Sequence, residues 1–290
     1  YEITTRLVGS EMCIRDRTYD ENILDIKGGL NDVVMNNSPI DIDKLIEGTN
    51  EILTANRNSL QLFDMLHSMR QFDDLTYVHS VNVALIASIL GQWLKFSEKD
   101  IRILTISGLL HDIGKIMIPN EILTKPGKLT VAEYNIMKQH VNFGYEKVKN
   151  QNIDIRIKEA CLLHHEKCDG TGYPFGLKSD HIPAVAKIIA IADVYDAMTS
   201  ARVYRGALCP FEVIDTMYKD AFTKFEPEYI LPFLKNVASS YINNDVRLSD
   251  GRIGKVVLIN ENALSLPIVQ CEDEFIDLSK TRGLTVSAIL

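Results

Sequence analysis

The sequence predicts a mainly α-helical protein that ends in a small β module. Apolar residues recur at helical spacing over most of the chain, and Ser97 and Thr130 are typical helix N-caps. After Asn244 the pattern changes, because β-branched residues alternate around Asp250-Gly251, a dipeptide typical of hairpin turns. With 290 residues the chain is long enough to bury a large core.

Four segments are expected along the chain. Residues 1–17 are interpreted as a non-native leader, because LVGSEMCIRDR from Leu7 resembles a translated sequencing-adapter remnant. On that hypothesis the natural protein can begin further upstream, with an additional N-terminal domain. Residues 18–70 are expected to be an N-terminal helical segment, 71–243 the main helical domain and 244–290 the β module.

The main domain is expected to be a series of helices separated by caps and breakers. Gly114 and Pro119 end one helical region, and Lys125–Thr130 is a turn before the helix that carries His140. The expected helices cover about 75–96, 97–112, 130–140, 155–165 and 182–200, with further helices over 210–241.

Composition narrows the functional classes. Hydrophobic residues make up 46% and charged residues 24%, as in an ordinary soluble globular protein, and the longest apolar runs are too short or too interrupted to cross a bilayer. The net charge of −8, without a Lys/Arg-rich block, argues against a general nucleic-acid binder. The five cysteines are scattered and form no CxxC motif, which indicates reduced thiols in a cytoplasmic protein.

Five of the seven histidines lie in apolar helical surroundings, together with two aspartates that should be buried. These residues are His79, His111, Asp112, His140, His164, His165 and Asp193. Neutral imidazoles and carboxylates are ligands for first-row divalent metals, and a buried carboxylate needs a cation. Seven ligands exceed what one metal uses. They predict two ions, which Asp112 can bridge and which can hold an attacking hydroxide between them.

Each residue alone also has a simpler interpretation. A single histidine on an apolar helix is more often a core residue than a ligand, and Asp193 can cap a helix or pair with an arginine. Lys115 lies one helical turn after Asp112, where it can neutralise charge on a phosphoryl group or be a solvated lysine. The Gly-rich turn HHEKCDGTGYP can cover a flat ligand or be purely structural. His67 and His181 are read as ordinary histidines.

Together, HDIGK (His111–Lys115), MKQH (Met137–His140), HHEKCDGTGYP (His164–Pro174) and IADVYDAMTSARVYR (Ile191–Arg205) resemble the HD-GYP branch of the HD phosphohydrolases. The resemblance runs from about Asp74 to Tyr241, with the motifs in the family order. It implies an HD-type helical bundle with a two- or three-metal centre that hydrolyses cyclic di-GMP to pGpG or GMP in bacterial signal transduction.

The resemblance also implies roles for individual residues. His79, His111, Asp112 and Asp193 would hold one metal, and Asp112, His140, His164 and His165 the other. Lys115 would contact the scissile phosphate. The remaining substrate contacts would come from Arg202 and Arg205 and from the turn at Gly172 and Tyr173.

One position departs from the family pattern. Members with three metals have a glutamate four residues before the first histidine, where this chain has Leu75. We therefore expect two ions, with Fe or Mn as the leading candidates.

Two alternatives remain open from the sequence. The domain can be a signalling module that binds cyclic di-GMP or a partner with little turnover, or it can hydrolyse another cyclic dinucleotide. Diguanylate cyclases, an upstream sensory domain and a second copy of the chain are open as partners.

Overall fold

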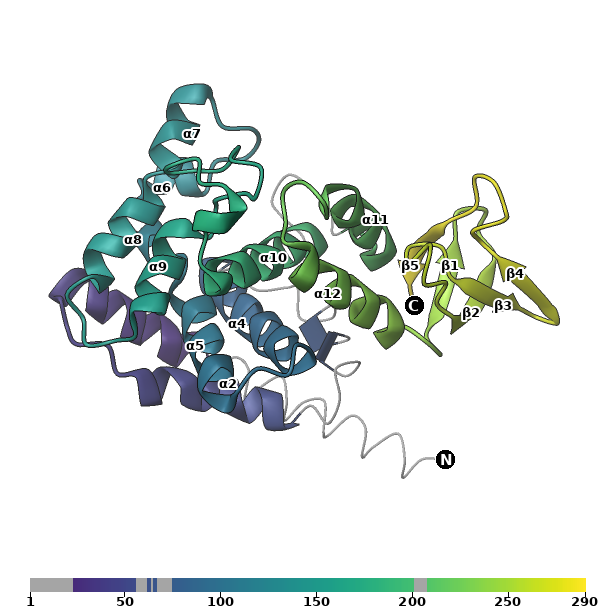
Figure 1. Ribbon diagram of the computed structural model, residues 1–290, viewed down its shortest axis with the longest axis horizontal. Helices are drawn as coiled ribbons and strands as arrows, with labels where there is room; N and C mark the ends of the chain where they lie inside the picture. The colour runs from purple at the N-terminus through teal and green to yellow at the C-terminus, as the bar shows by residue number, and fades with distance from the viewer. Residues whose placement is uncertain (1–22, 56–61, 64, 67–74, 201–207) are drawn as a thin grey trace.

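The computed structural model describes residues 23–55, 62, 63, 65, 66, 75–200 and 208–290. The expected leader over 1–17 and the residues His67, Arg202 and Arg205 lie outside the described residues. Helices dominate the described chain and a small sheet follows them, which confirms the predicted fold class (Figure 1).

A helix over residues 23–36 precedes the named elements. The helices are α2 (Ile42–Ala55), α4 (Leu75–Trp93), α5 (Glu98–Leu110), α6 (Asn120–Leu123), α7 (Val131–Met137), α8 (His140–Val148), α9 (Ile155–Leu163), α10 (Ala184–Thr199), α11 (Pro210–Asp220) and α12 (Pro227–Ser240), with short 3-10 turns η1 (Ile113–Met117) and η2 (Ser179–His181). Of the described helices, not one meets the length and apolarity that a bilayer crossing requires.

The centre of the bundle is formed by α4, α5, α9 and α10, with α8 packed on α9 and η1 (Figure 1). Two glycines allow the closest approaches. A Cβ at Gly108 of α5 would lie 2.4 Å from Ala84 Cα of α4, and a Cβ at Gly114 would lie 2.0 Å from the His140 carbonyl oxygen. Only glycine fits at both places, so α5 can lie directly against α4 and η1 directly against α8.

Both predicted helix caps are confirmed. Ser97 accepts a hydrogen bond from the Asp100 N–H, and Thr130 forms a capping box with Glu133. The expectation of one helix from Thr130 through His140 is wrong, because the structure divides this stretch into α7 and α8. At the break, the Met137 carbonyl accepts a hydrogen bond from the His140 imidazole, 2.7 Å away.

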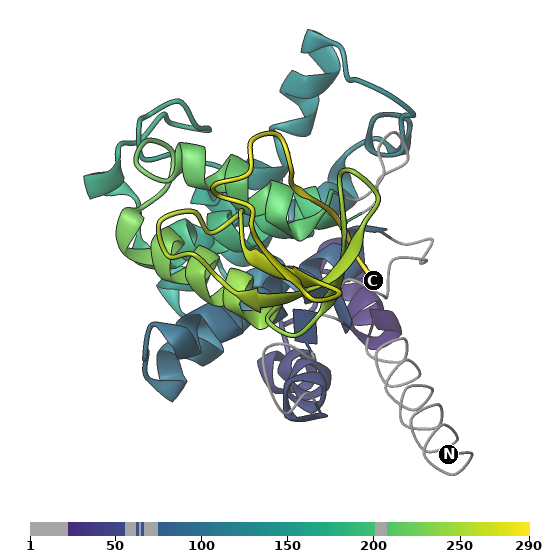
Figure 2. The same cartoon turned by 90° about the vertical axis from the view of Figure 1, so that its right-hand side faces the viewer.

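The C-terminal module is an antiparallel sheet in the order β4-β3-β2-β1-β5. Its strands are β1 (Asp245–Leu248), β2 (Ile253–Leu258), β3 (Ile268–Cys271), β4 (Glu274–Asp277) and β5 (Val286–Ile289). The hairpin between β1 and β2 turns at Gly251, which has a φ of 93°. Figure 2 shows the sheet in front of the helices, and β5 packs against α11.

Sheet and helices share one hydrophobic core. Val246, Val269 and Val286 of the sheet belong to the same buried cluster as Phe211 and Tyr241 of the helical part. The module is therefore packed on the bundle and does not hang from a linker.

Candidate metal centre

Five histidines and two aspartates converge where α4, α5, α8, α9 and α10 meet. Their nitrogen and oxygen atoms form two groups, and within each group these atoms lie within 4.8 Å of one another. One group is His79, His111 and Asp193, and the other is Asp112, His140, His164 and His165. The structure thus brings together all seven residues that the sequence singled out as candidate metal ligands.

Asp112 lies between the two groups. Its Oδ2 is 3.3 Å from His111 Nε2 and 3.5 Å from His79 Nε2, whereas its Oδ1 is 3.3 Å from His140 Nε2. His164 Nε2 also lies on the Oδ1 side, at 3.7 Å. Each carboxylate oxygen therefore faces a different set of imidazoles, as a bridging ligand requires.

Backbone carbonyls hold three of the imidazoles in one orientation. The Nδ1–H groups of His111, His140 and His164 donate to the carbonyls of Gly108, Met137 and Ala160, at 2.7, 2.7 and 3.0 Å. A carbonyl can only accept, so each ring carries its proton on Nδ1 and directs the Nε2 lone pair at Asp112. This is the tautomer that a metal-binding histidine needs.

Polar atoms at the centre lack a hydrogen-bond partner among the described residues. His111 Nε2 and Asp112 Oδ1 are among them, and both side chains are fully buried. A buried polar atom without a partner is costly, and cations bound on the two sides of Asp112 would satisfy these atoms. The donor set fits a divalent metal.

The electrostatics of the centre also suit metal binding. Burial lowers the pKa of His111, of His165 and of His140, for which the value is about 3, so these imidazoles are neutral. Burial opposes ionisation of Asp112, but neighbouring positive charge, including the Lys115 ammonium, holds the pKa of its carboxyl well below the usual range. The centre therefore presents neutral nitrogen donors and ionised carboxylates.

His79 differs because carboxylates approach both of its nitrogens. Burial lowers the pKa of His79, but Asp193 and Asp196 outweigh it and raise the value to about 9. The Nε2 atom lies 3.0 Å from Asp193 Oδ1, and Nδ1 lies 2.7 Å from Asp196 Oδ2. A metal held by Nε2 would have to replace a proton there.

Asp196 is a residue that the sequence reasoning missed. It is buried, and its other oxygen accepts hydrogen bonds from Asn82 Nδ2 at 2.9 Å and from Ser200 Oγ at 3.1 Å. Its position three residues after Asp193, on the same face of a buried helix, was the available signal. Its role is to fix the His79 ring, since it lies on the side away from the other ligands.

Lys115 contacts the bridging aspartate directly. Its Nζ donates to Asp112 Oδ2, and the side chain is 19% exposed. The ammonium thus lies at the centre and remains accessible to a ligand from outside.

A second missed residue, Glu166, shapes the turn after the paired histidines. Its buried carboxylate accepts hydrogen bonds from the N–H groups of Phe175, Gly176 and Leu177, at 2.7, 3.1 and 2.9 Å. A Cβ at Gly172 would lie 2.4 Å from Glu166 Cα, so the loop folds directly over this residue. Because side chain and backbone meet only in the folded loop, the sequence carried no clear signal for this role.

Tyr173 stacks on the ring of His165. The ring centroids are 4.7 Å apart and the planes differ by 29°. The turn therefore places an aromatic ring next to a candidate ligand. By contrast, exposed His181 pairs with Asp180 and takes no part in either group.

Residues 47–229, more than half of the chain, match the HD domain family. The chain belongs to the HD domain family. Its motifs and its relatives place it in the HD-GYP branch, which confirms the resemblance seen in the sequence.

Two curated relatives of this HD domain differ in the substrate that their names give. A cyclic di-GMP phosphodiesterase of Pseudomonas aeruginosa is 36% identical over 203 residues, which are 70% of this chain and 49% of the relative. A 3′3′-cGAMP-specific phosphodiesterase of Vibrio cholerae is 36% identical over 173 residues, 59% of this chain and 38% of the relative. The chain thus spans about half or less of these relatives.

A solved structure supports the fold. An HDG"Y"P protein from Bdellovibrio bacteriovorus superposes with a TM-score of 0.53 at 17% identity, covering 74% of this chain and 69% of that one.

Proposed function

We propose that this HD domain is a metal-dependent phosphodiesterase that hydrolyses cyclic di-GMP to pGpG, to GMP or to both. The observation that carries the proposal is Asp112, whose two oxygens face two separate sets of imidazoles. The cyclic-dinucleotide phosphodiesterases among the relatives support the same reaction class.

We propose two divalent ions, Fe or Mn. His79, His111, Asp193 and Asp112 would hold one, and Asp112, His140, His164 and His165 the other. Such ions supply Lewis acidity at a phosphoryl group and lower the pKa of water. A third ion is not expected at Leu75, which opens α4 and offers no ligand atom; its side chain lies outside the described part of the chain.

The chain's own residues would bind and orient the substrate. Lys115 already donates to Asp112, and its exposed fraction allows the ammonium to meet the scissile phosphate. Gly172 and Tyr173 would form the wall beside His165. Arg202 and Arg205, outside the described residues, stay predicted phosphate contacts. A cyclic dinucleotide messenger as substrate makes the cytoplasm the proposed location.

The competing hypotheses are a binding module with little turnover and an enzyme for another cyclic dinucleotide. The second hypothesis is supported by the relative that is named as a 3′3′-cGAMP-specific phosphodiesterase. A pure binding module has no chemical need for two sets of imidazoles around one carboxylate.

The test is turnover by anaerobically purified protein with Mn²⁺ or Fe²⁺ and a panel of cyclic dinucleotides, with products separated by chromatography. We expect cyclic di-GMP to be hydrolysed and close to two metal equivalents per chain. Asp112→Ala should lose both metal and turnover, because the bridging carboxylate serves both groups. Binding without hydrolysis in fully metallated protein would instead establish the binding module, and preference for another dinucleotide would reassign the substrate.

A further inference from the structure

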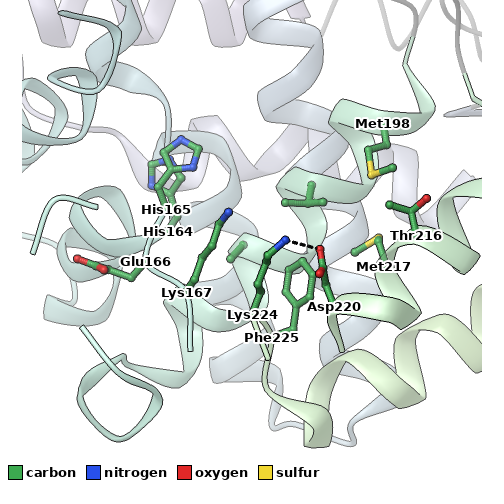
Figure 3. A pocket seen from close by; sticks show the side chains of 12 residues that line it. His164, His165, Glu166, Lys167, Met198, Thr216, Met217, Asp220, Lys224 and Phe225 are labelled. Atoms are coloured by element: carbon green, nitrogen blue, oxygen red, sulfur yellow. Dashed lines mark hydrogen bonds and ion pairs between the residues drawn. The ribbon is translucent and has the colours of Figure 1, made fainter. Parts of the chain in front are cut away.

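An open pocket lies directly beside the candidate metal centre. It occupies about 540 Å³, including space open to solvent, between the segment 164–167, α10, α11 and the turn at Lys224 and Phe225 (Figure 3). His164 and His165 contribute to its lining, so the pocket adjoins the metal centre.

One wall of the pocket is apolar. Val194 and Met198 are four residues apart and project from the same side of α10, and Met217 and Phe225 complete the wall. Asp193, which belongs to the metal centre, precedes Val194 on the same helix. A flat, weakly polar group can therefore rest on this wall while the rest of its molecule reaches the metal centre.

Two lysines also line the pocket. Lys224 pairs with Asp220 at 2.8 Å, whereas the ammonium of Lys167 makes no hydrogen bond or ion pair with any residue that the structure describes. Figure 3 shows the Lys167 side chain running beside that of Lys224, on the side of the paired histidines. Lys167 is thus a cation available to an anionic ligand next to the metal centre.

We propose that this pocket binds the half of the cyclic dinucleotide that is not being cleaved. Its base would lie on the apolar wall, and Lys167 would bind the second phosphate. The inference rests on the proposed function, because a cyclic dinucleotide has two phosphodiester groups and only one can be at the metal centre. This occupant would contact both features of the pocket, because its phosphate can bind the Lys167 ammonium and its base can lie on the apolar wall. A flexible chain with a single negative charge would bind the ammonium but would leave the apolar wall uncovered.

The test compares two substrates in two pocket variants. Lys167→Gln removes the charge at similar length, and Thr216→Trp fills the mouth of the pocket from an exposed position of α11. The substrates are cyclic di-GMP and bis(p-nitrophenyl) phosphate, a phosphodiester without a second phosphate or a nucleobase. The matched control is Lys99→Gln, an exposed lysine near the start of α5, about 18 Å along the helix from His111.

We expect each pocket variant to raise KM for cyclic di-GMP by roughly ten- to a hundredfold, with a smaller change in kcat. The loss in kcat/KM should be at least about tenfold larger for the dinucleotide than for the small diester. Lys99→Gln should leave kcat/KM unchanged for both the dinucleotide and the small diester.

Equal losses on both substrates, or unchanged KM in Lys167→Gln, would overturn the pocket assignment and leave the proposed function intact. Failure of the metallated wild-type protein to hydrolyse any cyclic dinucleotide would overturn both. Far-UV circular dichroism checks that each variant is folded. If Thr216→Trp does not fold, the result for Lys167→Gln decides the question.

Discussion

At the scale of single residues, the geometry of the centre is set by groups that touch no substrate. Carbonyl oxygens fix His111, His140 and His164, and the carboxylate of Asp196 fixes His79. These contacts use the ring nitrogen that faces away from Asp112. The second nitrogen of each ring is then oriented before any ion arrives, which reduces the entropic cost of binding.

The role of Asp196 can be separated from that of a ligand. In Asp196→Asn the His79 ring loses its charged acceptor, so we expect metal affinity to fall about 10- to 100-fold. Excess metal should restore turnover, because no proposed ligand has been removed. Isothermal titration calorimetry with Mn²⁺ measures the metal affinity, and turnover measured at increasing metal concentration shows whether activity is restored. Turnover that stays lost at saturating metal would contradict a positioning role.

Lys115 should act on the reaction and not on metal content. Lys115→Ala removes a charge that stabilises the developing phosphorane, so kcat should drop on the order of 10²–10³-fold while elemental analysis finds the wild-type metal content. Lys99→Gln again serves as the control for loss of a lysine charge. An unchanged kcat would exclude the proposed role.

The seven candidate ligands could be found in the sequence because each is a polar residue where apolar residues are expected. Asp196 satisfies the same criterion, whereas Glu166 lies in a polar turn. Their partners are a ring nitrogen from α4 and backbone N–H groups nine to eleven residues away. Such pairings appear only once the helices have packed. The pocket beside the centre was likewise beyond sequence reasoning, since α10 and α11 line it together.

At the scale of elements, glycines determine how closely the helices approach. Gly114 lets η1 touch α8 at the His140 carbonyl, and this contact sets the distance between Asp112 and His140. Loss of the Gly114 contact would separate Asp112 from His140, two candidate ligands of the same group.

We expect Gly114→Ala to be destabilising and to impair the centre. The added Cβ would be 2.0 Å from the His140 carbonyl oxygen, so η1 and α8 must move apart, at a cost of about 1–3 kcal/mol. Melting temperature and metal content should both fall. Gly28→Ala is the matched control, since a Cβ there meets no described atom within 4 Å; equal effects of the two changes would refute the steric explanation.

The start of α7 should respond to acid. Hydrogen bonds from Lys125 and Thr130 lower the pKa of Glu133 from 4.5 to about 2. A carboxyl with a depressed pKa stabilises the folded form above its unfolded value, so this contribution is complete above pH 4.5 and is lost as pH falls towards 2. Hydrogen exchange in a peptide covering 131–137 should show wild type and Glu133→Gln converging between pH 5 and pH 3. A constant difference across that range would disprove the assignment.

At the scale of the whole molecule, the sheet and the helices are parts of one packed body. The sequence could predict both classes of element, and the change of pattern after Asn244 marks the start of β1. It could not predict that β5 returns beside β1, nor that the core is continuous, because both depend on contacts between distant segments. The division of the chain into separate domains stays a prediction.

Coupling between sheet and bundle is measurable through Trp93, the only tryptophan, which lies in α4. Val286→Asp would bury a charge in the shared core and should lower the free energy of unfolding by about 3 kcal/mol. The fluorescence midpoint of Trp93 in urea should fall accordingly. Phe275→Asp, at a 65% exposed position of β4, should leave it nearly unchanged. A Trp93 transition insensitive to Val286→Asp would show that the sheet unfolds independently.

The two groups that share Asp112 are chemically unequal. One combines two imidazoles with the private carboxylate of Asp193, whereas the other has three imidazoles and no anion of its own. The first site has the harder ligand set and favours cations that prefer oxygen ligands, whereas the second has the softer, nitrogen-rich ligand set. On the proposed assignment, we expect the two positions to differ in metal preference, so that a protein grown with mixed metals would carry the elements in different proportions at the two positions.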